Sequence, residues 1–479
     1  MSRARTVLFW VAAAALLAGH VVVVWHSLVT RPFWEDEAFN LTVPRNLLAG
    51  LGYASDGALS GSTITPFDPR ISTGPVVLLP VAATLATGMD PVLAARLIPI
   101  AFWALLVAGL AVLGWRIAGP GASLLAAAVP LAFTADAGVS PIQGPADLLG
   151  EIPAAALLVW ALVVLQRRPW LAGLLVGLAV QAKLIALLAL PAFAVALWVL
   201  ADGSGWARIR RTLRRSWLPL ALVALPTALL EFAALLSLGP AAFVDHLREL
   251  IRFVRSGGQG DAGTTVVQKL ATLADSWSVP AAVAIVGAAL AIGLAATGVV
   301  RRWRSARESD RAVIAYALAA AVGALAFLGW WATASRLPLW VRHPAPGILA
   351  FFPILATVAV WSATRVVDRG WARIAAAVLA LIVAAAAVVH VTTASAPRPL
   401  TLDQQRHAAA QIAEWVEGND VTWIAAEPWG IAVAPVVLAG AHLGLHDAPA
   451  MADVPRLTGA ACTTETLVDA GLYRICAAP

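Results

Sequence analysis

Long apolar runs, separated by short clusters of arginine, dominate the sequence as far as Val391. A helix needs about 20 apolar residues to cross a bilayer, and short loops rich in Arg and Lys stay in the cytoplasm. The pattern therefore predicts an all-α polytopic membrane protein whose basic clusters all face the cytoplasm. These clusters are Arg3/Arg5, Arg116, Arg167/Arg168, Arg208 to Arg215, Arg301 to Arg311 and Arg365 to Arg373.

Placing every cluster on one side requires an even number of crossings between successive clusters. Three apolar runs lie between Arg5 and Arg116, so only two of them can cross. The middle run, 75–87, is too short and contains two prolines, so we expect a short helix on the outer side. Continuing the count gives about eleven crossings, which include one from 122 to 139 and a hairpin in 170–201 broken near Lys183.

The predicted outer regions are a large first loop, 30–95, three smaller loops at 140–150, 239–278 and 332–347, and the tail from Thr392. An amphipathic helix is expected at Phe243–Arg255, along the membrane surface. We divide the chain into a transmembrane domain, 1–394, and an extracytoplasmic C-terminal domain, 395–479.

The tail has the pattern of a small α/β domain, with a helix near Leu402–Val416 and an apolar strand at Val421–Ala425. Its two cysteines, Cys462 and Cys476, are the only ones in the sequence. They can pair if the tail lies outside the cytoplasm, and two unpaired thiols are the alternative.

Composition supports the membrane class, because 60% of the 479 residues are hydrophobic and only 13% are charged. The net charge of +6 comes from residues grouped between apolar runs, where they act as topology signals, so we exclude nucleic-acid binding. No small-residue cleavage site follows the first apolar run, which predicts an uncleaved first span.

Three adjacent carboxylates, Glu35, Asp36 and Glu37, follow this first span in a sequence that is poor in charge. Adjacent carboxylates repel one another, which raises the pKa of at least one unless a cation or donor compensates. Such a cluster can hold a divalent metal or supply a general base. The aromatic residues Trp34 and Phe39 flank the acids and suggest a partly desolvated site. The alternative is a set of solvated acids that ends the first helix.

The order and spacing of several short motifs resemble the C-type glycosyltransferase superfamily, which includes protein O-mannosyltransferases and lipid A aminoarabinose transferases that use polyprenyl-phosphate-linked sugars. The resemblance covers roughly residues 7–200, with a fainter match near 342. The motifs are Trp34-Glu35-Asp36-Glu37, Thr73-Gly74-Pro75, Leu78-Leu79-Pro80, Ala95-Arg96-Leu97, Leu149-Gly150-Glu151, the run from Ala172 to Ala179, Lys183 and Arg342-His343-Pro344.

The resemblance implies that Asp36 takes the proton of the acceptor as the acceptor attacks the anomeric carbon of the sugar, with phosphate leaving and the configuration inverting. Glu37 would orient the acceptor or a metal. Glu35 is an additional acid before the pair, which the usual pattern lacks, and we place it in the substrate-binding set.

A phosphate leaving group needs positive charge near the membrane surface. The outer-facing candidates are Arg96, Lys269, Arg336, Arg342 and His343. We favour Arg342 and His343, because they come directly before a span; interfacial anchoring is the alternative role for these cations.

Asp147 and Glu151 are four residues apart, so on one helix they would share a face and close the site opposite Asp36. The alternative is a pair of acids favoured by the dipole at a helix N-terminus. Glu231, inside a predicted span, is a further candidate for a functional group, whereas we interpret His246 as a surface residue.

These observations predict a glycosyltransferase of the plasma (inner) membrane that moves a sugar from polyprenyl phosphate to a glycan, lipid or protein acceptor at the outer face. A divalent metal is left open as a cofactor. The alternatives are a transporter or lipid flippase, and an assembly subunit whose tail binds a partner. Transporters of charged cargo place ionisable residues at mid-span, whereas the acids here lie in predicted loops.

Overall fold

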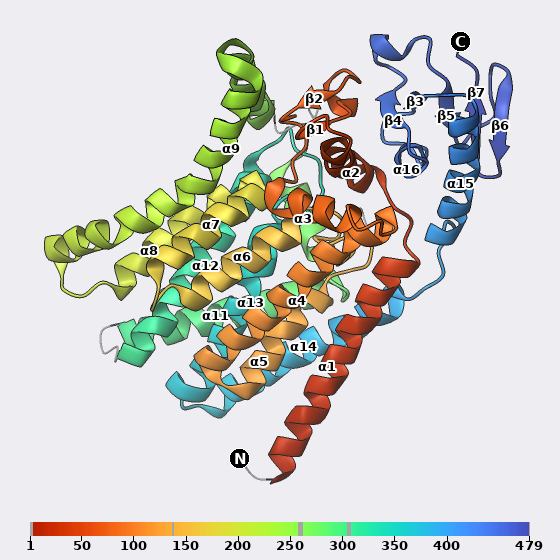
Figure 1. The fold of residues 1–479 in the computed structure, drawn as a ribbon. Helices are drawn as coiled ribbons and strands as arrows, with labels where there is room; N and C mark the ends of the chain where they lie inside the picture. The colour runs from red at the N-terminus through yellow and green to blue at the C-terminus, as the bar shows by residue number, and fades with distance from the viewer. Residues whose placement is uncertain (1–2, 137, 257–261, 304–307, 479) are drawn as a thin grey trace.

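The computed structural model describes residues 3–136, 138–256, 262–303 and 308–478 (Figure 1). In this part of the chain seven helices are long and apolar enough to cross a membrane, and several shorter apolar helices pack among them. The bundle helices are α1 (Arg3–Val29), α4 (Pro91–Ala118), α5 (Pro120–Ala128), α6 (Glu151–Val164), α7 (Pro169–Ala182), α8 (Leu190–Leu200), α9 (Gly205–Ser256), α11 (Ala281–Trp303), α12 (Glu308–Thr333), α13 (Ala345–Trp361) and α14 (Gly370–Ala394).

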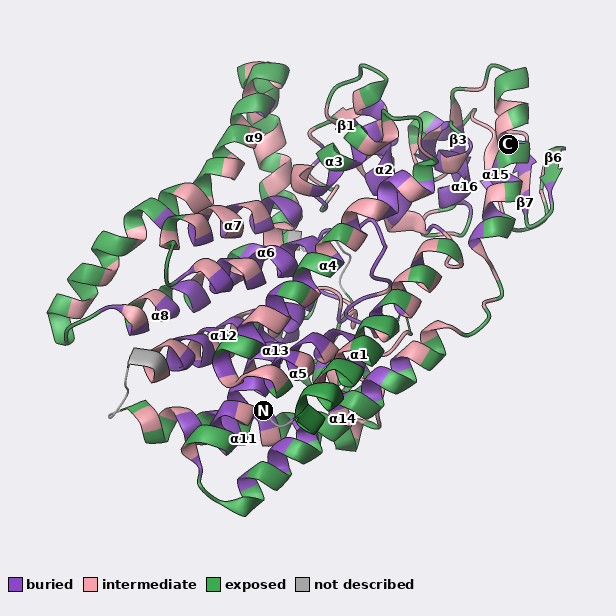
Figure 2. Ribbon diagram, turned by 60° about the horizontal axis from the view of Figure 1, so that its bottom comes forward, coloured by how far each residue is buried: buried purple, intermediate pink, exposed green. Residues whose placement is uncertain are grey.

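The arrangement of the turns agrees with the predicted grouping of the basic clusters. The connections α4–α5, α8–α9 and α13–α14 lie at one end of the bundle, together with the start of α1, the end of α11 and the start of α12 (Figure 1). The short elements between α1 and α4 and the C-terminal domain lie at the opposite end. Figure 2 shows that α6 and α13 are largely buried in the centre, whereas α1, α9 and α14 expose broad faces.

Two predicted crossings are interrupted in the structure. The run expected to cross from 122 to 139 is helical only through a 3₁₀ turn that ends at Ala132, after which Phe133 is extended and forms a bridge with Trp277. The 170–201 hairpin contains α7 and α8, joined by a 3₁₀ segment after Lys183. The predicted break near Lys183 is confirmed.

The predicted first outer loop contains two helices and a small antiparallel ladder. Helix α2 (Glu35–Leu48) is followed by strands β1 (Ala54–Ser55) and β2 (Thr65–Pro66) and by α3 (Pro75–Leu85). Helix α3 is the short helix expected at 75–87. It begins with Pro75, a favoured residue in the first turn because the missing N–H is not needed there.

The amphipathic segment 243–255 is helical, as expected, and a kink separates it from the earlier part of α9. The chain bends at Gly239, whose φ of 76° lies outside the helical range, and then resumes the helix. The bend brings His246 Nε2 within 3.2 Å of Glu231 Oε2, so His246 is not an isolated surface residue.

The C-terminal domain is the predicted small α/β unit. Helix α15 (Leu402–Gly418) precedes a five-stranded sheet of order β4-β3-β5-β7-β6, and α16 (Val433–Leu438) joins β3 to β4. Strand β3 is parallel to β4 and β5, whereas β7 is antiparallel to β5 and β6. The strands are β3 (Trp423–Ala426), β4 (His442–Leu445), β5 (Arg456–Thr458), β6 (Thr466–Ala470) and β7 (Tyr473–Cys476). Cys462 and Cys476 form a disulfide in this domain.

Polar contacts fix this domain on the outer segments of the transmembrane part. The Gln405 side chain bonds both backbone groups of Phe33, at 2.7 and 2.8 Å. The buried carboxylate of Asp56 accepts from Leu443 N at 2.7 Å and lies 2.9 Å from His442 Nδ1. The start of α2 is therefore held between the bundle and the C-terminal domain.

Candidate active site

The three carboxylates begin a second helix rather than end the first one. Glu35, Asp36 and Glu37 form the first turn of α2, after the N-cap Trp34, where the helix dipole favours negative charge. Successive residues of a helix point about 100° apart, so the three side chains reach different surroundings.

Glu37 points into the protein and pairs with Arg96 of α4. Both side chains are fully buried, and the Arg96 Nε and Nη2 atoms lie 3.0 and 2.7 Å from the two carboxylate oxygens. Glu37 also accepts from Leu148 N at 3.1 Å. The remaining Arg96 N–H groups donate to backbone carbonyls at the end of α1 and in the segment after it, so in this structure the guanidinium has no donor directed at an outer ligand. These carbonyls belong to Ser27, Leu28, Arg31 and Pro32.

Asp36 points toward the connection between α12 and α13 and pairs with Arg342. The Arg342 Nη1 atom lies 2.5 Å from Asp36 Oδ2, and the two side chains are 12% and 20% exposed. The guanidinium also lies over the rings of Trp34 and Trp340, with its Cζ atom 5.1 and 4.7 Å from the centroids. Stacking on two aromatic faces fixes the direction of this cation.

A small open cleft lies beside Asp36. Asp36, Phe39 and Asn40 line it from α2, and they share a face because they are three and four residues apart. The opposite wall comes from the segment that precedes α3 and from Leu149. The residues of that segment are Leu59, Arg70, Ile71 and Ser72.

Lys183, at the tip of the α7–α8 hairpin, contacts the same segment. Its Nζ atom lies 2.8 Å from Glu151 Oε1 and 2.9 Å from Ser72 Oγ. Two motif glycines allow this approach, because a Cβ at Gly74 or Gly150 would overlap the carbonyl oxygens at the end of α7. Three motifs that are far apart in sequence, containing Gly74, Gly150 and Lys183, therefore meet at one point.

His343 follows Arg342 and is half-buried beside several charged groups. Burial, with the nearby charges of Arg342 and Lys183, lowers the pKa of His343 to about 3, so the ring is neutral at pH 7. Its Nε2 atom is buried and has no hydrogen-bond partner in the structure.

The expectation that Asp147 and Glu151 share one helical face is wrong. Helix α6 begins at Glu151 with Gly150 as its N-cap, so Asp147 lies before the helix. Glu151 binds Lys183, whereas Asp147 lies near Glu37 and Arg96. Both oxygens of Asp147 are buried without a hydrogen-bond partner.

Glu35 faces the C-terminal domain. Burial raises the pKa of Glu35, and the negative charge of Asp36 adds to the shift. Burial also raises the pKa of Tyr473 in β7, with the charge of Glu35 contributing. Glu35 therefore lies at the junction of the two domains, with a pKa raised above its ordinary value.

Two other expectations concern further cations and a metal. Lys269 is buried, and its Nζ atom donates to Trp331 O and Ala334 O at 2.6 and 2.5 Å, away from Asp36. Among the described residues no group of three His, Cys, Asp or Glu side chains is arranged to hold a metal ion.

Sequence reasoning missed Arg70, Ser72 and Trp340 as cleft or site residues. Ser72 directly precedes the Thr73-Gly74-Pro75 motif and Arg70 lies two residues before Ser72, so the polar residues close to that motif were the available signal. Trp340 lies two residues before Arg342, but no pattern in the sequence predicts that it stacks on the arginine.

Among known proteins, the chain is similar to solved structures that have the same fold. No protein-family model and no curated protein matches the sequence. Among solved structures, ArnT from Cupriavidus metallidurans bound to undecaprenyl phosphate superimposes with a TM-score of 0.64 at 13% identity, covering 99% of this chain and 98% of ArnT.

Two further solved structures are similar to this chain over part of their own length. An oligosaccharyltransferase from Archaeoglobus fulgidus, in complex with Zn and sulfate, gives a TM-score of 0.52 at 14% identity over 92% of this chain and 62% of its own. The arabinofuranosyltransferase AftD from Mycobacteria gives 0.52 at 17% identity over 93% of this chain and 32% of its own. The chain thus has the fold of the C-type membrane glycosyltransferases, as the sequence motifs predict.

Proposed function

We propose that this protein is an integral-membrane glycosyltransferase that moves a sugar from a polyprenyl-phosphate carrier to an acceptor at the extracytoplasmic face of the inner membrane. The fold supports this proposal, because a structure of the same fold over nearly its whole length is bound to undecaprenyl phosphate. The observation that carries the proposal is the Asp36–Arg342 pair at the side of an open cleft.

Asp36 is the general base in this proposal. It is the one acid of the Glu35-Asp36-Glu37 cluster that lines the cleft. As the acceptor oxygen attacks the anomeric carbon, its proton passes to the Asp36 carboxylate. The bond from the anomeric carbon to the phosphate oxygen breaks, and its electron pair leaves with polyprenyl phosphate. Attack from the side opposite the leaving group inverts the configuration at that carbon.

Arg342 binds the phosphate of the donor and stabilises the charge that develops as the bond breaks. Lys183 and Arg70 are further cations on the Ser72 side of the cleft. The neutral ring of His343 supplies one hydrogen bond next to Arg342. Glu151 keeps Lys183 in place through their 2.8 Å ion pair.

Glu37 and Arg96 act as positioning residues in this proposal. Their buried ion pair fixes the first turn of α2 against α4 and the end of α1, and so directs Asp36 toward the cleft. Neither side chain has a free group facing the cleft, so we do not assign them to the acceptor, to a metal or to phosphate. No step of the proposed reaction passes through a metal.

The proposal is tested by reconstituting the full chain in proteoliposomes with radiolabelled sugars on polyprenyl phosphate, using bacterial envelope extract as the source of acceptors. A transferase releases polyprenyl phosphate and moves label into the extract only when both substrates are present. A transporter or flippase would instead move the intact labelled lipid across the bilayer without breaking the sugar–phosphate bond. Mass spectrometry of copurified lipid provides an independent check, since bound polyprenyl phosphate supports the donor class.

A further inference from the structure

The first turn of α15, in the C-terminal domain, binds the segment that connects α1 to α2. Leu402 N donates to Thr30 O at 3.1 Å. The Gln405 side chain accepts from Phe33 N at 2.7 Å and donates to Phe33 O at 2.8 Å. Leu402 and Gln405 are 0% and 1% exposed, and they lie on one face of α15 because they are three residues apart. This face therefore binds both ends of the segment 30–33.

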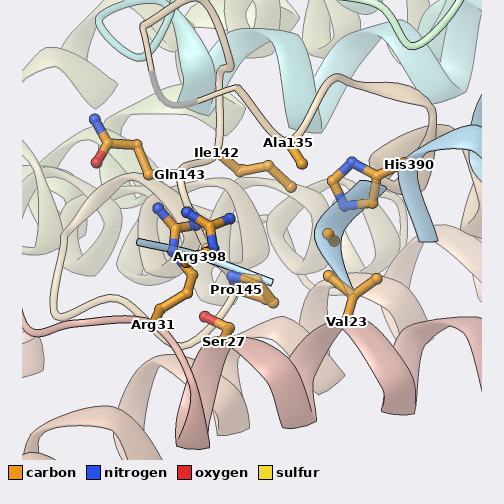
Figure 3. A pocket seen from close by; sticks show the side chains of 11 residues that line it. Val23, Ser27, Arg31, Ala135, Ile142, Gln143, Pro145, His390 and Arg398 are labelled. Carbon is orange, nitrogen blue, oxygen red and sulfur yellow. The ribbon is translucent and has the colours of Figure 1, made fainter. Parts of the chain in front are cut away.

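Arg96 binds the middle of the same segment. Its Nη1 atom donates to Arg31 O and its Nη2 atom donates to Pro32 O, both at 3.0 Å. The Arg31 side chain lies at a separate small cavity, next to Arg398, and does not line the cleft beside Asp36 (Figure 3). Each carbonyl of the segment 30–33 thus accepts a hydrogen bond from α4 or α15. These bonds restrict the backbone that leads into α2.

The C-terminal domain makes another contact beyond Asp36 along the chain. Trp429, in the connection between β3 and α16, packs edge-to-face on Phe39, with the ring centroids 5.5 Å apart and the planes at 85°. Phe39 is 3% exposed and lines the same cleft as Asp36. Trp429 has a φ of 56°, a strained conformation that a non-glycine residue keeps where its surroundings determine it. The domain therefore contacts Phe33 and Phe39, on either side of Asp36.

The rotation of α2 about its axis decides which acid reaches the cleft. Successive helical side chains point about 100° apart, so a partial rotation changes the surroundings of each acid in the first turn. In this structure Asp36 lines the cleft and pairs with Arg342. Misplacement of a reacting group by about 1 Å can lower a rate by about 10²-fold. The contacts that fix α2 therefore bear directly on the reaction.

We propose that Gln405 and Trp429 are positioning residues, through which the C-terminal domain sets the rotation of α2 and directs Asp36 toward the cleft. This inference rests on the proposed function, because it gives the domain a role in the transfer step. Neither residue needs to touch a substrate. Arg342 belongs to the connection between α12 and α13, so loss of either contact should lower kcat and leave binding of the donor nearly unchanged.

Steady-state kinetics of the full chain in proteoliposomes, with labelled polyprenyl-phosphate sugar and envelope extract, tests this role. Gln405→Met keeps the size of the side chain but loses both bonds to Phe33. Its kcat should fall about tenfold, with a donor KM within about twofold of the wild type. Gln411→Met, the same change at an exposed position of α15, is the control and should match the wild type. Wild-type kcat in folded Gln405→Met would overturn the proposal.

A double variant separates positioning of Asp36 from a general structural effect. If Gln405 acts through Asp36, Gln405→Met should not lower the residual kcat of Asp36→Asn any further. A further tenfold fall in the double variant would contradict this role.

Hydrogen exchange measures the loosening of α2 without reference to activity. The Ala38 amide donates to Trp34 O at 3.0 Å in the first turn of α2. It should exchange faster in Gln405→Met than in Gln411→Met, whereas α13 should exchange at the same rate in both. Equal exchange at Ala38 in the two variants would contradict the proposal.

Trp429→Gly provides a second test if Gln405→Met unfolds. Trp429 is 50% exposed, and a glycine adopts its positive φ without strain. The variant should lower kcat severalfold at an unchanged donor KM, and wild-type kcat would overturn the proposal. An inactive wild type would overturn the proposed function itself, whereas an active wild type with unaffected variants would overturn only the positioning role.

Discussion

The guanidinium of Arg342 lies 2.5 Å from the carboxylate of Asp36, although 306 positions separate the two residues in sequence. In this structure the proposed base is thus paired with the arginine that we propose binds the donor phosphate. A phosphate that enters the cleft competes with Asp36 for Arg342 and frees the carboxylate to accept a proton. The donor is therefore expected to bind before the acceptor, and initial-rate kinetics with both substrates varied tests this order.

Arg342→Lys keeps the charge but loses the planar group that stacks on Trp34 and Trp340. We expect the KM for the polyprenyl-phosphate donor to rise about tenfold, because an ammonium neither stacks nor forms two parallel bonds to phosphate. The KM for the acceptor should change little. Steady-state kinetics in proteoliposomes measures both constants. An unchanged donor KM would separate Arg342 from phosphate binding.

Glu37→Gln should destabilise the protein strongly, because it leaves the guanidinium of Arg96 buried without its counterion. Breaking a buried pair costs about 3–5 kcal/mol. Thermal unfolding in detergent measures the change as a fall in apparent Tm. Asp368→Asn, which removes one partner of the exposed pair with Arg373, is the matched control and should leave Tm nearly unchanged. A Glu37→Gln variant with normal Tm would contradict the positioning role.

Acidification should destabilise the protein through His343. The pKa of His343 is lowered to about 3 in the folded state by burial and by nearby cations, whereas it is about 6.5 in the unfolded chain. Between these values the unfolded chain binds the extra proton, so stability falls as pH drops from about 6.5 toward 3. The loss from pH 7 to pH 5 should approach about 2 kcal/mol.

His343→Gln removes this titration, so its Tm should fall less than that of the wild type over the same pH range. The other charged groups around the ring are Arg342, Lys183, Glu151 and Lys269. Parallel curves of Tm against pH for wild type and variant would show that His343 has an ordinary pKa in the folded protein.

Reduction of Cys462–Cys476 should loosen the C-terminal sheet without unfolding the helical bundle. The bridge joins residues 14 positions apart, and a loop of this size is stabilised by about 3 kcal/mol in the chain-entropy model. Hydrogen exchange in β6 and β7 should speed up after reduction, whereas α13 should exchange as before. Unchanged exchange in β7 would show that the sheet is held by packing alone.

The helical architecture is largely predictable from sequence, because apolar length and arginine clusters both follow from the membrane as solvent. The grouping of basic turns at one end, the short α3 helix and the break near Lys183 all follow from that pattern. Helix ends are less predictable. The helix start at Glu151 depends on Gly150 packing against α7, a tertiary contact that no local pattern encodes.

The sequence predicts where the candidate site lies, but it does not predict the role of each residue in it. The acidic cluster and the Arg342-His343 motif do meet in space. Which carboxylate faces Arg342 and which faces Arg96 depends on the rotation of α2, which is set by packing against α4 and the C-terminal domain. Asp147 and Arg96 are buried beside Glu37, in other segments of the chain.

Asp36→Asn tests the central claim most directly. The change keeps size and hydrogen bonding but removes the base, so sugar transfer from labelled polyprenyl phosphate should fall by about 10²–10⁴-fold with little change in Tm. Glu35→Gln, its neighbour in the same helical turn, is the matched control and should retain most of the activity. Transfer at wild-type rate by a folded Asp36→Asn protein would contradict the proposed mechanism.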